Sequence, residues 1–190
     1  MTEKEKMLAG KLFDPADKEL CRGRERARRL CRQFNLSTET EKKLRLKILQ
    51  DLFQTQNTSL WIEPDFRCDY GDNIKLGKNV FMNFSCIILD TATVTLGDNV
   101  LLGPGVHIYT PLHPMDPDVR STMIESSKPV TISDNVWIGG GAIICPGVTI
   151  GAGSVIGAGS VVTKNIPDNV LAVGNPCRVI RSVKETDKKP

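Results

Sequence analysis

Residues 130–162 read VTISDNVWIGGGAIICPGVTIGAGSVIGAGSVV, and a branched aliphatic residue recurs at every sixth position of this stretch. The positions are Ile132, Ile138, Ile144, Ile150, Ile156 and Val162. A small or β-branched residue stands two positions before each of them, and glycines crowd the turns between. An α-helix has about 3.6 residues per turn, so this period excludes a helix. Hexapeptide repeats are typical of a solenoid of stacked strands.

The six-residue period predicts a triangular prism. Six residues form one flat side and its corner, about eighteen complete one coil, and each sixth-position aliphatic points inward onto the coil below. Successive coils should rise by about 4.8 Å, the spacing between neighbouring strands.

The same pattern begins earlier in a less regular form, over residues 74–80 and 94–103. Leu96, Leu102 and Ile108 keep the register of Ile132 modulo six. Between the early and late repeats, residues 109–128 break the pattern. Loops of about twenty residues without a regular pattern are uncommon and are usually functional. We therefore expect the inserted loop 109–128 to carry function.

The chain before Leu60 has helical character. Apolar residues at helical spacing predict a first helix, with a buried face formed by Ala16, Leu20, Ala27, Leu30, Cys31 and Phe34. A second helix is expected to open at Thr38, where TETE has the form of a capping box. Its expected buried stripe is Leu44, Ile48, Leu49, Leu52 and Phe53. The predicted organisation is a helical cap over 1–58, a β-helix over 59–183 and a flexible tail over 184–190.

Composition limits the partners. The 190-residue chain has a net charge of only +3, and acids are interleaved with the arginines of the first helix. A solvated helix face is therefore favoured over a nucleic-acid surface. The chain has no run of eighteen apolar residues, and MTEKEK lacks the apolar core of a signal peptide. We expect a cytoplasmic protein that binds neither nucleic acid nor membrane.

Six scattered cysteines with no CxxC spacing predict neither a zinc site nor a redox pair. No metal is expected.

The chain has two histidines. His107 lies inside a repeat, where a structural role or a contact to a neighbouring subunit is favoured. His113 lies at the root of the inserted loop between Pro111 and Pro114, which restrict the backbone around it. Because an imidazole has an ordinary pKa of about 6.5, His113 is the candidate general base.

Two further residues suit a reaction at His113. Glu125, at the far end of the same loop, is a candidate to orient its imidazole. Asn83 would supply an amide to the developing negative charge or to the acceptor hydroxyl. The alternative for Asn83 is an ordinary turn amide. No serine beside a histidine forms a recognisable nucleophile motif, so a covalent acyl-enzyme is not required.

Several motifs together resemble the maltose and galactoside O-acetyltransferase family. They are MLAGKLF (7–13), FRCDYG (66–71), NFSC (83–86), HIYT (107–110) with His113-Pro114, and NVWIGG (135–140). The likeness runs from about residue 3 to residue 183, and FRCDYG and HIYT are more similar to the maltose enzymes. It implies a mainly β fold, a left-handed parallel β-helix with an N-terminal α-helical cap, which is an exception to right-handed crossovers.

The resemblance also implies a homotrimer with active sites between subunits and acetyl-CoA as the co-substrate. Carried over by position, His113 is the general base that deprotonates a sugar hydroxyl for direct attack on the thioester, with Asn83 and Glu125 as companions. Asp69 matches an acceptor contact, and Asp17 is a second candidate. Thr91 replaces a sugar-binding aspartate of the galactoside branch, which favours a maltose- or glucose-type acceptor.

The cofactor side has its own candidates. Gly140 and Ala158 would let the thin pantetheine arm lie close to the backbone, and Trp137 either shapes that groove or simply packs. Cations near the C-terminus would bind the phosphorylated adenosine; the candidates are Thr163, Lys164, Arg178 and Arg181. An ordinary solvated tail is the alternative interpretation of the two arginines.

A hexapeptide-repeat prism could also serve three other functions. A zinc-dependent carbonic anhydrase on this prism needs three histidines, and the chain has two. A hexapeptide acyltransferase acting on serine, an amino sugar or an antibiotic keeps the fold and His113, and is the main alternative. A non-catalytic solenoid binding module would not explain a proline-bracketed histidine together with a basic C-terminal end.

Overall fold

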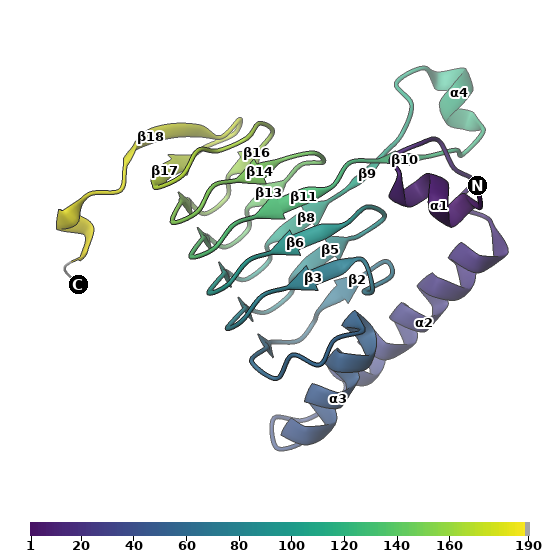
Figure 1. Ribbon diagram of the computed structural model, residues 1–190, viewed down its shortest axis with the longest axis horizontal. Coiled ribbons are helices and arrows are strands. Elements are labelled where there is room, and N and C mark those ends of the chain that lie inside the picture. Colours follow the sequence, from purple (N-terminus) through teal and green to yellow (C-terminus); the bar gives the residue numbers. More distant parts are fainter. Residues whose placement is uncertain (189–190) are drawn as a thin grey trace.

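The computed structural model describes residues 1–188 and consists of a stack of parallel strands with helices at its N-terminal end (Figure 1). Three parallel sheets form the three faces of a prism, which confirms the predicted β-helix with a helical cap. Within residues 1–188, none of the helices combines the length and the apolar character needed to cross a membrane.

We number the faces in the order in which the chain visits them. The first face holds β1 (Trp61–Ile62), β4 (Phe81–Met82), β7 (Leu101–Leu102), β12 (Trp137–Ile138), β15 (Val155–Ile156), β17 (Val170–Val173) and the antiparallel β18 (Arg178–Ser182). The second face holds β2 (Arg67–Cys68), β5 (Ile87–Leu89), β8 (His107–Tyr109), β13 (Ile143–Ile144) and β16 (Val161–Val162). The third face holds β3 (Ile74–Leu76), β6 (Val94–Leu96), β11 (Val130–Ile132) and β14 (Thr149–Ile150). The chain turns at the first corner between the first and second faces, at the second corner between the second and third, and at the third corner as it returns.

The sixth-position aliphatics form the core because each lies directly over its counterpart in the next coil. Ile138 pairs in register with Leu102 on one side and Ile156 on the other, and all three are at most 1% exposed. The same stacking joins Ile108 to Ile144 on the second face. The six-residue period of the sequence therefore corresponds to the stacking of inward-facing side chains in successive coils.

The early coils look irregular in sequence because they are longer at one corner. The inward residues Ile88 and Leu96 are eight positions apart across the second corner, whereas Ile144 and Ile150 are six apart. The inserted loop leaves the prism at this same corner, after β8. The second corner of the first three coils is therefore where the chain departs from the minimal repeat.

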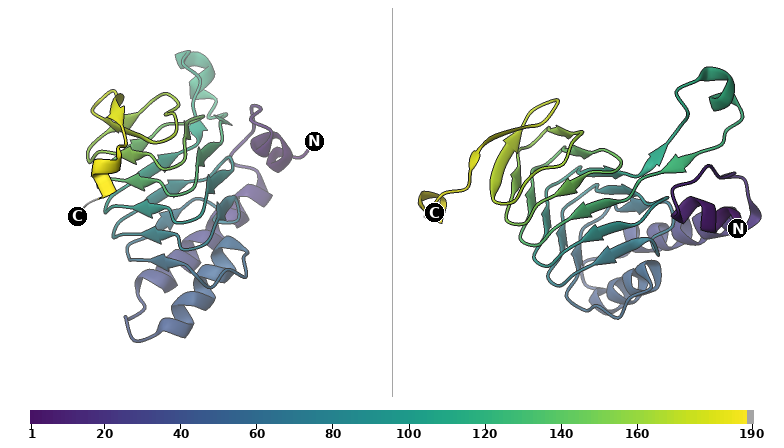
Figure 2. Two further views of the ribbon diagram at one scale, coloured as in Figure 1. Left: turned by 60° about the vertical axis from the view of Figure 1, so that its left-hand side comes forward. Right: turned by 45° about the horizontal axis from the view of Figure 1, so that its top comes forward.

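The inserted loop has regular structure of its own. It contains β9 (Pro111–Leu112), helix α4 (Pro117–Ser121) and β10 (Ser126–Ser127), and the two strands pair antiparallel. The loop projects from the prism beside the N-terminal helix (Figure 2). The expectation of about twenty patternless residues is therefore wrong, because a short hairpin organises the root of the loop.

The N-terminal helices are α1 (Glu3–Leu8), α2 (Lys18–Asn35) and α3 (Lys42–Phe53). The sequence did not predict α1, which begins with a capping box between Thr2 and Glu5. The predicted start of the second helix at Thr38 is wrong by four residues, because Glu41 bonds back to Thr38 in a turn before α3. Leu44 and Ala16, both expected to be buried, are exposed, whereas the other apolar positions predicted for α2 and α3 are buried.

A ladder of asparagines runs along the third corner. Asn79, Asn99 and Asn135 each have a positive φ, between 54° and 59°. The Nδ2 atom of Asn79 donates to Oδ1 of Asn99, and Nδ2 of Asn99 donates to Oδ1 of Asn135, both at 3.0 Å. These side chains tolerate the left-handed conformation that the tight corner requires.

At the C-terminal end of the prism β18 pairs antiparallel with β17, and the chain then leads away from the stack into a short 3₁₀ helix, Glu185–Lys188 (Figure 1). Arg181 forms an ion pair with Asp187 at 2.6 Å. The last two residues of the predicted tail, 189–190, lie outside the described residues.

Candidate active site

The hairpin at the root of the inserted loop places two candidate residues opposite each other. Ser126 pairs with Leu112 and Ser127 with Pro111, so continuing this antiparallel register puts Glu125 opposite His113. Side chains at opposite positions of an antiparallel pair lie on the same face, with Cβ atoms about 4.5–5.5 Å apart. His113 is exposed and Glu125 is half-buried. The hairpin register is therefore compatible with a pairing of His113 and Glu125, which stays a prediction.

The backbone of Glu125 is fixed by the N-terminal segment. Its N–H donates to the carbonyl of Phe13 at 3.1 Å, and its carbonyl accepts from the N–H of Phe13 at 2.9 Å. Phe13 is 1% exposed and belongs to a small buried cluster with Met7, Leu20 and Tyr70. The helical cap therefore holds the far end of the inserted loop as well as covering the prism.

Asp69 lies at the second corner, directly after β2. Burial raises the pKa of its carboxyl, the cations of Arg24 and Arg28 oppose that rise, and the negative charge of Glu125 adds to it. An electrostatic effect of this kind requires the two carboxyls to lie near each other. Asp69 and Glu125 are therefore neighbouring acids.

Asp90 is a site residue that the sequence reasoning missed. Its carboxylate accepts hydrogen bonds from the backbone N–H groups of Asp69, Tyr70 and Gly71, at 3.0, 2.9 and 2.8 Å. Asp90 itself is completely buried, and burial raises its pKa to about 7. The available signal was an acid placed immediately after the apolar strand residues Ile87–Leu89, at the corner that holds Asp69 one coil earlier.

Asn83 lies elsewhere in the chain, at the first corner, directly after β4. Its Oδ1 atom accepts from the N–H of Phe84 at 2.7 Å, and among the described residues its Nδ2 group has no protein acceptor. The whole second face separates Asn83 from His113. Three strand residues alone span about 10 Å, so these two side chains do not meet within one chain.

The remaining histidine is engaged on the outer side of the second face. The Nδ1 atom of His107 lies 2.6 Å from the hydroxyl oxygen of Tyr109. Its place inside strand β8 fits the structural role expected of it.

The first corner also carries the small residues expected to line the cofactor groove. Gly103, Gly139 and Gly157 occupy equivalent positions in successive coils, each followed by a corner residue: Pro104, Gly140 or Ala158. A Cβ on Gly139 would lie 2.5 Å from the backbone nitrogen of Ala158, and one on Gly140 would lie 3.0 Å from the carbonyl oxygen of Pro104. These glycines therefore let successive coils pack closely, and the corner carries little side-chain bulk. Ala158 is exposed, so a thin ligand arm that followed this corner would meet its side chain.

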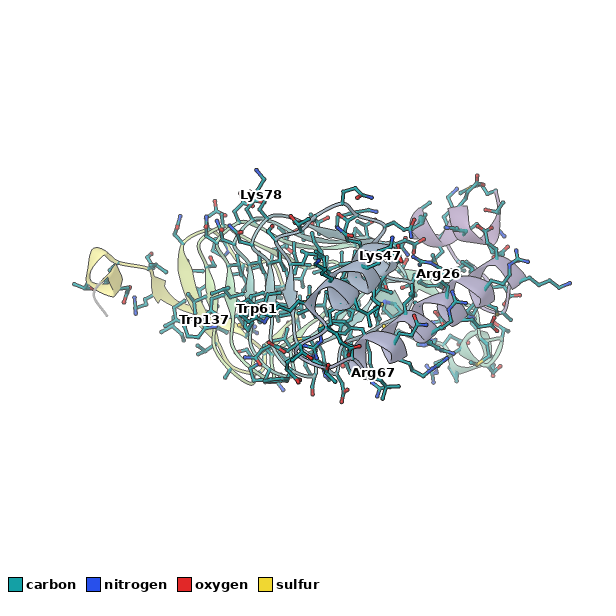
Figure 3. All side chains as sticks on the ribbon, turned by 90° about the horizontal axis from the view of Figure 1, so that it is seen from below. Arg26, Lys47, Trp61, Arg67, Lys78 and Trp137 are labelled. Atoms are coloured by element: carbon teal, nitrogen blue, oxygen red, sulfur yellow. The ribbon has the colours of Figure 1, made fainter. Side chains whose placement is uncertain are left out.

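Trp137 stands beside this corner on the outer side of the first face, 53% exposed. It continues a column formed by Trp61, Phe81 and Leu101 in successive coils. Figure 3 shows Trp61 and Trp137 on the same side of the prism. The exposed column favours a contact with a ligand or another chain over simple packing within this one.

The cationic candidates are divided between two places. Thr163 and Lys164 are exposed at the second corner, directly after β16, whereas Arg178 and Arg181 lie on β18. The guanidinium of Arg181 already binds Asp187, and that of Arg178 donates to the carbonyl of Cys177 at 2.8 Å. One chain does not gather these residues around the corner that holds Gly140 and Ala158.

Asp17 has a structural role in this structure. Its Oδ1 atom caps α2 by accepting from the N–H groups of Glu19 and Leu20. The cap fixes the position of Asp17 a few residues after Phe13, on the side of the molecule that holds the loop. A contact between Asp17 and the acceptor stays a prediction.

The candidates thus fall on two corners with complementary chemistry. The second corner offers an imidazole with nearby carboxylates, suited to accepting a proton from a hydroxyl. The first corner offers a free amide N–H group and little side-chain bulk, suited to a thioester oxygen and a narrow ligand.

Comparison with known proteins agrees with this arrangement. Residues 6–56 match the maltose acetyltransferase hexapeptide capping motif, and residues 129–164 match the bacterial transferase hexapeptide family of six repeats. The chain belongs to the hexapeptide-repeat acetyltransferases, in the family that includes the maltose and galactoside O-acetyltransferases.

Particular relatives cover nearly the whole chain. The galactoside O-acetyltransferase of Escherichia coli (strain K12) is 45% identical over 184 residues, covering 97% of this chain and 91% of the relative. The crystal structure of a maltose O-acetyltransferase from Clostridium difficile 630 is 53% identical, with a TM-score of 0.95 and coverage of 97% and 99%. A hexapeptide-repeat acetyltransferase of Vibrio cholerae O1 biovar eltor, solved with acetyl coenzyme A, is 39% identical, with a TM-score of 0.90 and coverage of 97% and 100%. The chain is therefore an acetyltransferase with acetyl-CoA as its donor.

Proposed function

We propose that this chain transfers the acetyl group of acetyl-CoA to a hydroxyl of a maltose- or glucose-type sugar, with His113 as the general base. The observation that carries the proposal is the β9–β10 register, because its continuation by one residue would set His113 opposite Glu125. The names of the relatives, a maltose and a galactoside O-acetyltransferase, support a sugar hydroxyl as the acceptor.

Each residue has a defined task in this reaction. The imidazole of His113 accepts the proton of the acceptor hydroxyl as the oxygen attacks the thioester carbonyl, and Glu125 orients the ring. The carbon–sulfur bond of the tetrahedral intermediate then breaks, and the imidazolium returns the proton to the departing CoA thiolate. Proton transfer by a positioned base contributes a factor of about 10²–10⁴ to the rate. The Nδ2 group of Asn83 donates to the carbonyl oxygen as negative charge develops on it. Asp69 accepts a hydrogen bond from another hydroxyl of the sugar.

The active enzyme is a homotrimer in this proposal. Because Asn83 and His113 lie on different corners of one chain, a complete site needs the first corner of one subunit beside the second corner of another. Closed rotational symmetry satisfies this head-to-tail contact for every subunit. The exposed apolar column from Trp61 to Trp137 would be covered in the same assembly.

The same pairing of corners completes the acetyl-CoA groove. Gly140, Ala158 and Trp137 line one wall, and Thr163 and Lys164 of the neighbouring subunit would provide cations on the other. Arg178 and Arg181 lie toward the C-terminal end of the prism, where they would meet the phosphates.

Thiol release from acetyl-CoA tests the proposal directly. The acceptors are maltose, glucose, a galactoside, serine, glucosamine and chloramphenicol, each with wild type, His113→Ala and Glu125→Gln. We expect sugar-dependent release that falls about 10²–10⁴-fold in His113→Ala, and less in Glu125→Gln.

Melting temperature is the control for this experiment. His113 is exposed, so its replacement should leave the melting temperature unchanged. Release that depends on serine or chloramphenicol but not on sugar would reject the acceptor class, and full activity in His113→Ala would reject the base.

A further inference from the structure

A cavity of about 660 Å³ lies between α2 and the second face, close to the candidate active site. Helix α2 contributes Arg28 and Arg32 to its lining, and Arg67 of β2 faces them. Asp69 borders the same space. The volume falls within the range of about 300–1,000 Å³ that small-molecule sites occupy.

The three arginines of this cavity have no partners within the described residues 1–188. Their guanidinium groups form no hydrogen bond and no ion pair with any described residue. Other arginines are engaged: Arg24 donates to Tyr70, and Arg45 donates to Ser37. Arg22 and Arg29 of α2 are unengaged as well but do not line this cavity, so three of the unengaged guanidinium groups lie around one hollow.

The positions of these arginines follow from the elements that carry them. Arg28 and Arg32 are four residues apart on α2, so they lie on one side of the helix. Arg67 is the outward residue of β2, because its neighbour Cys68 is buried. Figure 3 shows Arg67 on the opposite side of the molecule from Lys78, next to the helices. Two walls of the cavity thus present cations to each other.

The floor of the cavity is uncharged. Cys31 and Cys68 lie there with their sulfur atoms 3.8 Å apart and are only 5% and 7% exposed. Ile87 and Leu89 of β5 complete this surface. Arg28, Arg32 and Arg67 are themselves exposed, so solvent and salt partly screen their attraction for an anion.

Two carboxylates, of Asp65 and Asp69, also border the cavity, and three guanidinium groups outnumber them. Burial raises the pKa of the Asp69 carboxyl, and the cations of Arg24 and Arg28 oppose that rise. The planar guanidinium group matches carboxylate and phosphate oxygens in pairs. The chemistry of the cavity favours an anionic group.

Asp69 joins the cavity to the reacting end of the site. The charge of Glu125 acts on the carboxyl of Asp69, and the β9–β10 register continued by one residue would set Glu125 opposite His113. A sugar whose hydroxyl reaches His113 would pass Asp69 and extend into the space between Arg28, Arg32 and Arg67.

We infer that this cavity binds a carboxylate or phosphate group of the acceptor, so that the preferred substrate is an anionic sugar. The inference rests on the proposed function, because it takes the acetylated hydroxyl to be the one at His113. The inference adds that the sugar acceptor carries a negative charge, which neither the fold nor the general base implies.

The test compares matched neutral and charged acceptors. Acetyl transfer is measured with methyl glucoside, glucuronate and glucose 1-phosphate, using wild type, Arg32→Gln and Arg67→Gln. We expect kcat/KM to be about ten-fold higher for a charged sugar than for methyl glucoside in wild type. Either variant should remove most of that difference, while kcat/KM for methyl glucoside stays within about two-fold of wild type. Of the two charged sugars, the one that shows the larger preference identifies carboxylate or phosphate as the group bound.

Arg29→Gln is the matched control. Arg29 is exposed on the same helix but does not line the cavity, so its replacement should preserve the preference for charged sugars. Equal kcat/KM for neutral and charged sugars in wild type would overturn the inference and leave the proposed function intact.

A binding measurement distinguishes failure of the anion-binding inference from failure of the proposed function. Calorimetric titration of glucose 1-phosphate and glucuronate into the protein needs no turnover. Binding that weakens about ten-fold in Arg32→Gln and Arg67→Gln, but not in Arg29→Gln, supports the cavity even if another step prevents acetylation. Binding that is absent, or equal in all four proteins, overturns it, whereas transfer to no sugar hydroxyl at all rejects the proposed function.

Discussion

The Oδ1 atom of Asp90 accepts a hydrogen bond from the backbone N–H of Asp69, 3.0 Å away, across one coil of the prism. The same carboxylate binds the N–H groups of Tyr70 and Gly71. A completely buried acid thus fixes the main chain that carries the proposed acceptor contact. Asp90 is a positioning residue, because it acts on the acceptor only through Asp69.

Replacing Asp90 with Asn should change how stability depends on pH. Burial raises the pKa of Asp90 from its ordinary 3.8 to about 7, while the hydrogen bonds from Tyr70 and Gly71 act against the rise. The folded state then binds the proton more tightly than the unfolded state, so the contribution of this carboxyl is largest below pH 4 and falls as pH rises to 7. Asn does not titrate and leaves one N–H group poorly satisfied, which costs about 1–3 kcal/mol near pH 5.

Urea unfolding of both proteins between about pH 4.5 and pH 8 checks this prediction. The stability advantage of wild type over Asp90→Asn should shrink as pH rises across that range. Parallel curves for the two proteins would show that Asp90 does not titrate there.

Mixing two inactive variants should restore activity if sites are shared between subunits. Asn83→Ala and His113→Ala each disable every site in their own trimers. In randomly mixed trimers, about a quarter of the sites would combine an intact His113 with an intact Asn83 of the neighbour. Thiol release after co-refolding measures the recovery, and refolding each variant alone is the control. No recovery, with mixed trimers shown by mass, would place both residues in one subunit's site.

Ala158→Leu should block the cofactor groove without unfolding the prism. Ala158 is exposed at the first corner, so a larger side chain there projects over a corner with little side-chain bulk and not into the core. We expect KM for acetyl-CoA to rise about ten-fold or more, because a thin ligand arm cannot pass, with KM for the acceptor unchanged. Steady-state kinetics and a melting curve check both statements.

Gly139→Ala is the contrasting variant for the same corner. Its Cβ would lie 2.5 Å from the backbone nitrogen of Ala158, so the coils must separate and the melting temperature should fall. If Ala158→Leu lowered the melting temperature as much as Gly139→Ala, the effect on KM would reflect a distorted prism.

Phe13→Ala should loosen the inserted loop. Truncating a buried Phe costs about 3–5 kcal/mol, and Phe13 belongs to a cluster separate from the main core. We expect faster amide hydrogen exchange at Glu125 and a lower kcat, with exchange in β12 and β13 unchanged. Leu12→Ala is the matched control because Leu12 is 53% exposed. Unchanged protection at Glu125 would show that the loop holds itself.

The six-residue period predicted the prism because an inward-facing aliphatic residue recurs at the same position on each side of the regular coils. The role of His113 was predicted from its prolines and its place in the inserted loop. That role and its pairing with Glu125 stay predictions, with which the hairpin register is compatible. Asp90 and the neighbouring thiols of Cys31 and Cys68 could not be identified, because their contacts depend on how separate coils and α2 come together. The start of α3 was misplaced because Thr38 forms only half of a capping box: its N–H and its hydroxyl both donate to the Glu41 carboxylate, and the Glu41 N–H bonds to the Thr38 carbonyl in a turn.

The asparagine ladder at the third corner shows that the coils close in the same way whether or not they carry the inserted loop. Asn79 and Asn99 are 20 residues apart, Asn99 and Asn135 are 36 apart, and both pairs make the same 3.0 Å hydrogen bond. The coil therefore closes identically whether or not the chain makes a long excursion at the opposite edge. A loop of another length or composition could be grafted between β8 and β11 while the rest of the stack keeps its register. This modularity would let new acceptor preferences arise by exchanging one surface segment, with the acetyl-donor wall left untouched.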